Sequence, residues 1–150
     1  VIISNYVQHK KLIAYFSDYK VQRIGLVMGV RKLQHILRET CEQNPDNLLG
    51  AFGELFPRNV RLYVYPARDK NSGELTNAQN LSMPKEIRFL FQYLLDNGNI
   101  VDIQHFNPDI LGIYHREVLK MIQQGAPGWE ENVPEEVARL IREKRLFGYN

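Results

Sequence analysis

Four short segments of the sequence carry side chains that suit the binding of a charged ligand. Each follows an apolar run typical of a β-strand, and in open α/β sheets ligands bind beyond the carboxyl ends of the strands. We therefore expect one shared ligand site, with contributions from Ser4, Asn5, Gly29, Arg31, Lys32, Arg68, Asp69 and His105. The segments are Ser4-Asn5-Tyr6, Gly29-Val30-Arg31-Lys32, Pro66-Ala67-Arg68-Asp69-Lys70 and Gln104-His105-Phe106-Asn107.

The segment from Gly29 to Lys32 stands between an expected strand and the start of an expected helix. Backbone N–H groups at a helix N-terminus, with Arg31 and Lys32 nearby, would hold a phosphate or a carboxylate. Neither G-x-G-x-x-G nor G-x-x-x-x-G-K-[ST], the two glycine-rich nucleotide patterns, occurs in the chain. The alternative is a tight turn followed by an exposed helix face.

Arg68 and Asp69 are adjacent opposite charges that follow the clearest predicted strand, residues 60–65, after Pro66 and Ala67. Asp69 would orient Arg68 toward an anionic ligand through charge-assisted hydrogen bonds. The alternative is a solvated loop that contains an incidental ion pair, because surface pairs are common and weak.

His105 is the one ligand candidate with a reference pKa near neutrality, which suits an acid or a base. No other residue is positioned by the sequence to activate it, so a packed structural histidine is the alternative. The four histidines lack metal-ligand spacing and no serine stands in a G-x-S-x-G setting. The sequence therefore assigns no catalytic residue, metal site or cofactor.

Hydrophobic periodicity and turn residues predict the elements that position these segments. Apolar runs predict four strands, at residues 1–3, 23–28, 60–65 and 100–103. Helical spacing predicts helices over 6–19, around 33–37, after a cap at Asp46, from 82–84 to a left-handed turn at Asn97-Gly98, over 115–123 and from Pro134. Residues 67–81 are polar and predict a long loop with a turn at residues 71–73.

This alternation predicts an α/β fold that forms a single domain over residues 1–150. We expect a three-layer, Rossmann-like arrangement of about four mostly parallel strands, with helices on both faces and two further helices at the C-terminus. Val1-Ile2-Ile3 is apolar from the first residue, which indicates a C-terminal part of a longer chain whose missing part lies on the N-terminal side.

The last helix has acidic residues in its first turn and basic residues in its last, which suits the helix dipole. Gly148 has the position of its C-terminal cap, with Tyr149 folding back on the final turn. Trp129 lies in a Gly- and Pro-rich turn before this helix and is expected to anchor it by packing. The alternative for Trp129 is an interaction hot spot.

Composition narrows the class of partner. The chain has 19 Lys and Arg against 17 Asp and Glu, a formal net charge of +2, which is too balanced to indicate a nucleic-acid partner. Its single cysteine, Cys41, excludes an intrachain disulfide and favours a reducing, cytoplasmic location. No apolar run reaches the length of about 20 residues that crosses a bilayer, so no membrane partner is expected.

A further set of stretches is distinctive when taken together, namely residues 24–30, 50–56, 59–66 and 116–119, Trp129, Val133-Pro134 and residues 146–149. Together they resemble the C-terminal region of a family of large bacterial proteins that carry labels such as nicotinate-nucleotide adenylyltransferase or TonB-dependent receptor. The residues support neither label. Helices separate the short buried strands, unlike a membrane β-barrel, and an H-x-G-H phosphate site is absent.

Two functions follow from the sequence. The first is a ligand-binding or accessory domain of a larger cytoplasmic protein, which binds an anionic metabolite or a nucleotide at the carboxyl ends of the strands. The second is a non-catalytic structural or assembly domain that uses the C-terminal helices as an interface. Its partners would be the remainder of its own chain and, as a homo-oligomer, further copies of itself.

Overall fold

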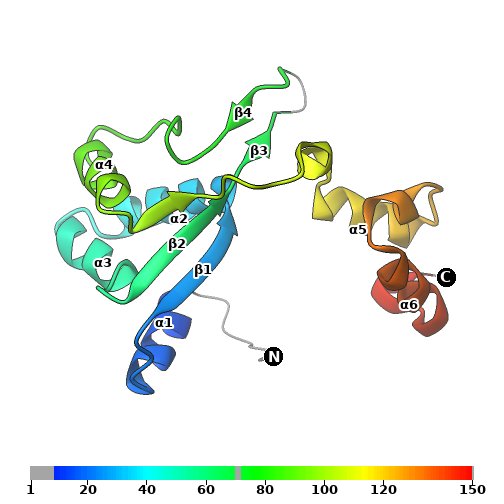
Figure 1. Ribbon diagram of the computed structural model, residues 1–150, viewed down its shortest axis with the longest axis horizontal. Coiled ribbons are helices and arrows are strands. Elements are labelled where there is room, and N and C mark those ends of the chain that lie inside the picture. The colour runs from blue at the N-terminus through cyan, green and yellow to red at the C-terminus, as the bar shows by residue number, and fades with distance from the viewer. Residues whose placement is uncertain (1–8, 70–71, 150) are drawn as a thin grey trace. The chain divides into compact units, whose positions relative to one another are not determined.

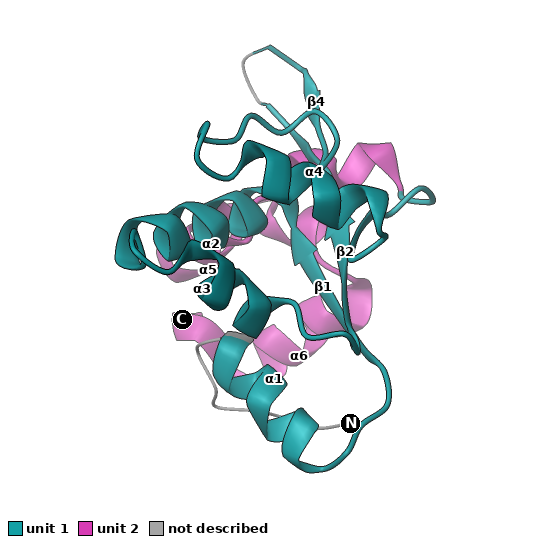
Figure 2. Ribbon diagram, turned by 90° about the vertical axis from the view of Figure 1, so that its left-hand side faces the viewer, with its two compact units in different colours: residues 1–106 teal, residues 107–150 magenta. Residues whose placement is uncertain are grey.

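The structure is a computed structural model that describes residues 9–69 and 72–149. The chain divides into two compact units, residues 1–106 and 107–150, which Figure 2 colours separately. The expected single domain over residues 1–150 stays a prediction. The strand expected at residues 1–3 lies outside the described residues.

Unit 1 is a mixed α/β unit, as Figure 1 shows. The order of its elements agrees with the expected alternation of strands and helices. They are α1 (His9–Asp18), β1 (Ile24–Gly29), α2 (Val30–Gln43), α3 (Leu48–Leu55), β2 (Val60–Tyr65), β3 (Ala67–Arg68), β4 (Leu75–Thr76), α4 (Arg88–Asp96) and β5 (Ile100–Asp102).

The main sheet has three parallel strands in the order β1-β2-β5, which confirms the predicted parallel sheet. Gly29 at the end of β1 pairs with Tyr65 at the end of β2, and Val64 pairs with Asp102 at the end of β5. The three strands therefore end at one edge of the sheet.

One face of this sheet carries the core of unit 1. The inward positions of β1, β2 and β5 alternate with outward positions, as the pleat of a strand requires. Helices α1 to α4 add apolar side chains to the same core, and Figure 2 shows α2 and α3 on one side of the strands. Fully buried members include Val30, Leu33, Leu37, Val64 and Ile87.

The predicted three-layer arrangement with helices on both faces is not confirmed. Strands β2 and β5 are added successively on the same side of β1. Right-handed crossovers in one direction place their helices on one face, whereas helices on both faces require a reversal of the strand order.

The opposite face of the sheet is largely accessible. Val27 is 70% exposed on it. The ring of Tyr63 lies across Gly25, where a Cβ atom would stand only 3.2 Å from Tyr63 Cε2. The rings of Tyr65 and Phe106 contact each other edge to face, with centroids 6.0 Å apart.

The polar stretch after β2 differs from the expected loop, because it contains a small antiparallel hairpin made of β3 and β4. Each of the two strands has only two residues, too few to produce a periodic pattern in the sequence. Gly73 adopts a φ of +70° in the turn, and part of the expected turn, residue 71, lies outside the described residues.

Two helices begin later than expected. The side chain that caps α3 is Asn47, whose Oδ1 accepts a hydrogen bond from the Gly50 N–H at 3.3 Å, and not Asp46. Helix α4 begins at Arg88 and not near Pro84, because a turn closed by the Ile87 N–H on the Pro84 carbonyl precedes it. The left-handed turn at Gly98 is confirmed, with a φ of +66°.

Unit 2 consists of short helices around a small apolar core. They are η1 (Pro108–Gly112), α5 (His115–Gln124), η2 (Trp129–Asn132), α6 (Glu135–Lys144) and η3 (Leu146–Gly148). Trp129 is only 2% exposed and packs in one cluster with Val118, Ile122, Ala138 and Ile141, so the anchoring role is confirmed.

The end of α6 differs from the expected one. Arg145, with a φ of +47°, takes the left-handed cap position that the sequence assigned to Gly148. Gly148, with a φ of +82°, follows one short turn later, and the ring of Tyr149 packs on Trp129 at 5.7 Å between centroids.

The described part of the chain contains no helix with the length and apolar character that spanning a membrane requires.

Candidate ligand site at the carboxyl edge of the sheet

The carboxyl edge of the sheet is where most of the predicted ligand residues gather. Helix α2 follows β1 there, the β3–β4 hairpin follows β2, and the segment with His105 follows β5. Their strand ends are neighbours through the Gly29–Tyr65 and Val64–Asp102 pairs. Ser4 and Asn5 lie outside the described residues.

Arg31 and Asp69 come together although 37 residues separate them in the sequence. Arg31 Nη2, in the first turn of α2, lies 3.9 Å from Asp69 Oδ2 at the start of the hairpin turn. Their side chains are 57% and 46% exposed. This ion pair therefore connects two of the predicted segments at an accessible point.

The hairpin itself fixes the position of Asp69. Asp69 Oδ1 accepts hydrogen bonds from the N–H and the Oγ–H of Ser72, at 3.0 and 3.3 Å. The neighbouring Arg68 donates from Nη1 to the Gly73 carbonyl at 3.2 Å. Arg68 is thus oriented by a backbone carbonyl of the turn, and the expected orientation by Asp69 stays a prediction.

Gly29 stands at the N-cap of α2 in an extended conformation, with a φ of −71° and no side chain that caps the helix. A Cβ atom at Gly29 would meet nothing within 4 Å, so the space beside the N-cap of α2 is open. The positive end of the helix dipole therefore faces an accessible region.

Lys32 and His105 are exposed, and neither side chain forms a hydrogen bond or an ion pair with any described residue. Lys32 adds a second cation to the first turn of α2. His105 follows the end of β5, but its side chain is not joined to Arg31, Arg68 or Asp69 by any contact.

Asp102, which the sequence interpretation missed, is the buried polar residue of the described chain, with 9% exposure. Its Oδ1 accepts from the Ala78 N–H at 2.8 Å and its Oδ2 accepts from the Gln79 N–H at 3.3 Å. The carboxylate thus fastens the chain that returns from the hairpin to the end of β5. An acidic residue inside an apolar strand run was the available signal.

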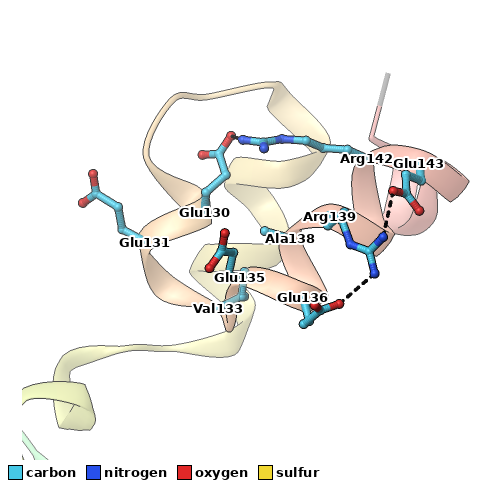
Figure 3. A pocket seen from close by; sticks show the side chains of 9 residues that line it. All are labelled: Glu130, Glu131, Val133, Glu135, Glu136, Ala138, Arg139, Arg142 and Glu143. Carbon is cyan, nitrogen blue, oxygen red and sulfur yellow. Dashed lines mark hydrogen bonds and ion pairs between the residues drawn. The ribbon is translucent and has the colours of Figure 1, made fainter.

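Unit 2 contains a separate open groove, drawn in Figure 3, with a volume of about 690 Å³. Val133 and Ala138 contribute apolar surface, and five glutamates and two arginines surround it. Arg139 bonds to Glu136 and Glu143, and Arg142 bonds to Glu130. The hydrogen bond from Arg142 lowers the pKa of Glu130 below its ordinary value.

A second groove of unit 2 is mostly apolar and has a volume of about 440 Å³. Residues of α5, α6 and η3 line it, among them Leu119, Val137 and Phe147.

Across residues 9–69 and 72–149, no group of three or more His, Cys, Asp or Glu side chains is arranged to hold a metal ion.

Comparisons with protein-family models, with curated proteins and with solved structures give no match, so the resemblance to a family of large bacterial proteins stays a prediction.

Proposed function

We propose that unit 1 is a ligand-binding domain that recognises an anionic group, a phosphate or a carboxylate, at the carboxyl edge of its sheet. In this proposal it serves a larger cytoplasmic protein as a binding or accessory domain for an anionic metabolite or a nucleotide. The observation that supports it best is the approach of Arg31 to Asp69 beside the uncapped start of α2.

The charges at this edge favour an anion. Arg31, Lys32 and Arg68 supply three cations, and Asp69 is already engaged by Ser72 and Arg31. The carboxylate of Asp102 is also engaged, because its two oxygens accept hydrogen bonds from the Ala78 and Gln79 N–H groups. A bound phosphate would add hydrogen bonds from the first-turn N–H groups of α2 to those from the guanidinium of Arg31.

The existing ion pair would not prevent binding. The Arg31–Asp69 distance of 3.9 Å exceeds that of a hydrogen bond, and both side chains are about half exposed. Exposed pairs of this kind contribute roughly 0–1 kcal/mol. An anion can therefore gain charge-assisted bonds from Arg31 while Asp69 keeps the side chain near the helix start.

The test is a titration of the full chain with ADP and, separately, with inorganic phosphate. Calorimetry measures the affinity, and amide chemical shifts locate the binding site. We expect saturable binding, with shift changes at residues 29–32 and 68–69. Arg31→Gln should weaken binding at least about tenfold, because a hydrogen bond to a charged group contributes roughly 1.5–3 kcal/mol.

Arg38→Gln is the matched control, because Arg38 is an exposed arginine two turns further along the same helix. It removes the same charge and should leave the affinity unchanged. Equal losses from Arg31→Gln and Arg38→Gln would reduce the effect to net charge. Such equal losses refute the proposal, and so does a titration in which neither ADP nor inorganic phosphate binds saturably.

A second candidate, assembly through the C-terminal helices, is favoured by apolar side chains that α6 leaves exposed. Val137 and Leu140 are 39% and 38% exposed. Trp129 does not serve this role directly, because its side chain is buried in the core of unit 2.

A further inference from the structure

Helix α6 has apolar side chains on two sides. Ala138 and Ile141 face the core of unit 2 and are 5% and 2% exposed. Val137 and Leu140, three residues apart on the outer side, are more than a third exposed. A surface helix that packs on one side normally presents polar residues on the other, and on α6 Val137 and Leu140 add apolar surface beside the charged residues of that side.

The apolar surface continues from α6 into the neighbouring groove. Val137 lines this groove together with Leu119 and Phe147, whose side chains are 38% and 59% exposed. Phe147 has a φ of +58°, a left-handed conformation that is strained for an aromatic residue. The backbone thus holds a large apolar ring at the rim of an apolar groove.

Two of the exposed charges of α6, Glu136 and Lys144, lie symmetrically about Leu140, while Arg139 and Glu143 form an ion pair with each other. Glu136 precedes Leu140 by four residues and Lys144 follows it by four, so both share its side of the helix. Lys144 forms no ion pair with any residue in the described part of the chain. Glu136 is bonded to Arg139 at 2.8 Å in an exposed pair.

We propose that α6 pairs in an antiparallel manner with α6 of a second copy of this chain, around a two-fold axis beside Leu140. The two Leu140 side chains then contact each other, and Val137 of each copy extends the apolar contact toward its groove. Glu136 of one copy lies level with Lys144 of the other, because each is about 6 Å along the helix from Leu140.

The charge arrangement is what favours a second copy as the occupant. A two-fold interface uses the same surface twice, so that surface must be complementary to itself. The acidic first turn and the basic last turn of α6 meet that condition only in the antiparallel arrangement, which also opposes the two helix dipoles. A parallel pair would set Glu136 against Glu136 and Lys144 against Lys144.

Analytical ultracentrifugation of the full chain tests this proposal, over protein concentrations from roughly 1 μM to 1 mM, a range that covers weak dimers. We expect a reversible monomer–dimer equilibrium that weakens as salt is added, because the Glu136–Lys144 pairs are exposed. Leu140→Glu should weaken the dimer at least tenfold. A wild-type chain that stays monomeric over this range refutes the proposal.

Charge reversal separates specific pairing from a general loss of apolar contact. Glu136→Lys and Lys144→Glu should each weaken the dimer severalfold, and the double variant should recover most of the wild-type affinity. Lys120→Glu on α5, an exposed charge reversal outside α6, is the control and should leave the dimer unchanged. Circular dichroism confirms that each variant is folded, and failure of the folded double variant to recover excludes the antiparallel register.

The inference is independent of the proposed anion site, since it rests on residues of unit 2 alone. A dimer without anion binding, or anion binding without a dimer, would therefore identify which of the two proposals fails.

Discussion

The two units of this chain obtain their stability from cores of very different size. Among the described residues, unit 1 buries fifteen apolar side chains around a parallel sheet, whereas the core of unit 2 has five. Trp129 is the largest side chain of the smaller core. Unit 2 has 44 residues, and the fraction of surface that a chain can bury falls with its size.

The difference suggests how each unit responds to damage. In unit 1 the loss of one side chain leaves many other contacts in place, and β2 continues to join both neighbouring strands. In unit 2 the helices α5 and α6 meet at a cluster of five buried residues, of which Trp129 is the largest. Four substitutions test this difference between the units, and the first has the largest expected effect.

Trp129→Ala should destabilise unit 2 by about 3–5 kcal/mol, the usual range for removal of a buried large aromatic side chain. Trp129 is 2% exposed and is the largest side chain of a cluster of five, so its truncation removes much of the apolar contact in the core of unit 2. Hydrogen exchange followed by mass spectrometry should show lost protection in α5 and α6, with protection retained in β1 and β2.

Leu37→Ala is the corresponding change in unit 1, because Leu37 is fully buried in the larger core. It should destabilise unit 1 by about 2–5 kcal/mol and leave α5 and α6 protected. If either variant lowers protection equally in both units, residues 1–150 unfold as the single domain that the sequence predicts and the comparison of two units fails.

Asp102→Ala tests the polar part of unit 1 and should cost about 1–3 kcal/mol, the penalty for leaving buried donors without partners. The Ala78 and Gln79 N–H groups would lose their carboxylate acceptor. Exchange should rise at these two amides more than in β2. Asp102→Asn keeps one acceptor oxygen and should retain the protection of one amide. Exchange at both amides that stays at the wild-type rate in Asp102→Ala would show that the carboxylate does not hold the loop.

The smallest expected effect concerns Glu130, whose pKa is lowered, first of all by the hydrogen bond from Arg142. A lowered pKa in the folded state adds stability that is complete above the ordinary value near 4.5 and is lost as the pH falls through the lower folded value. Glu130→Gln should therefore reduce the acid sensitivity of unit 2. Hydrogen exchange in unit 2 measures this between neutral pH and pH 3. Loss of protection by the same amount in wild type and variant over that range would contradict the prediction.

Local patterns in the sequence were sufficient for the elements that repeat a clear period. The strand expected over residues 60–65 is β2 with the same bounds, and the helix expected from His115 is α5. The buried positions Leu33 and Leu37 of α2 were recognised from helical spacing. In these segments the intrinsic preference of the residues and their burial agree.

Features that depend on contacts between distant residues were harder to predict. The strand order decides which face the helices cover, and no local pattern encodes it. Strands of two residues, such as β3, have no period to detect. In the candidate site, the rule about strand ends selected Arg31 and Asp69 separately, but their contact depends on a pairing register and a hairpin. Asp102 was missed because its partners, Ala78 and Gln79, lie in a loop without a motif.

Trp129 is the one tryptophan among the 150 residues, and its buried position gives the molecule a built-in optical reporter. Excited at the red edge of aromatic absorption, where Tyr and Phe contribute little, the chain emits from the core of unit 2 alone. The guanidinium of Arg142 lies 5.7 Å from the indole ring and the ring of Tyr149 packs against it, so the emission senses both contacts. Light from this one side chain therefore distinguishes the folding of the smaller unit from that of the larger without any added label.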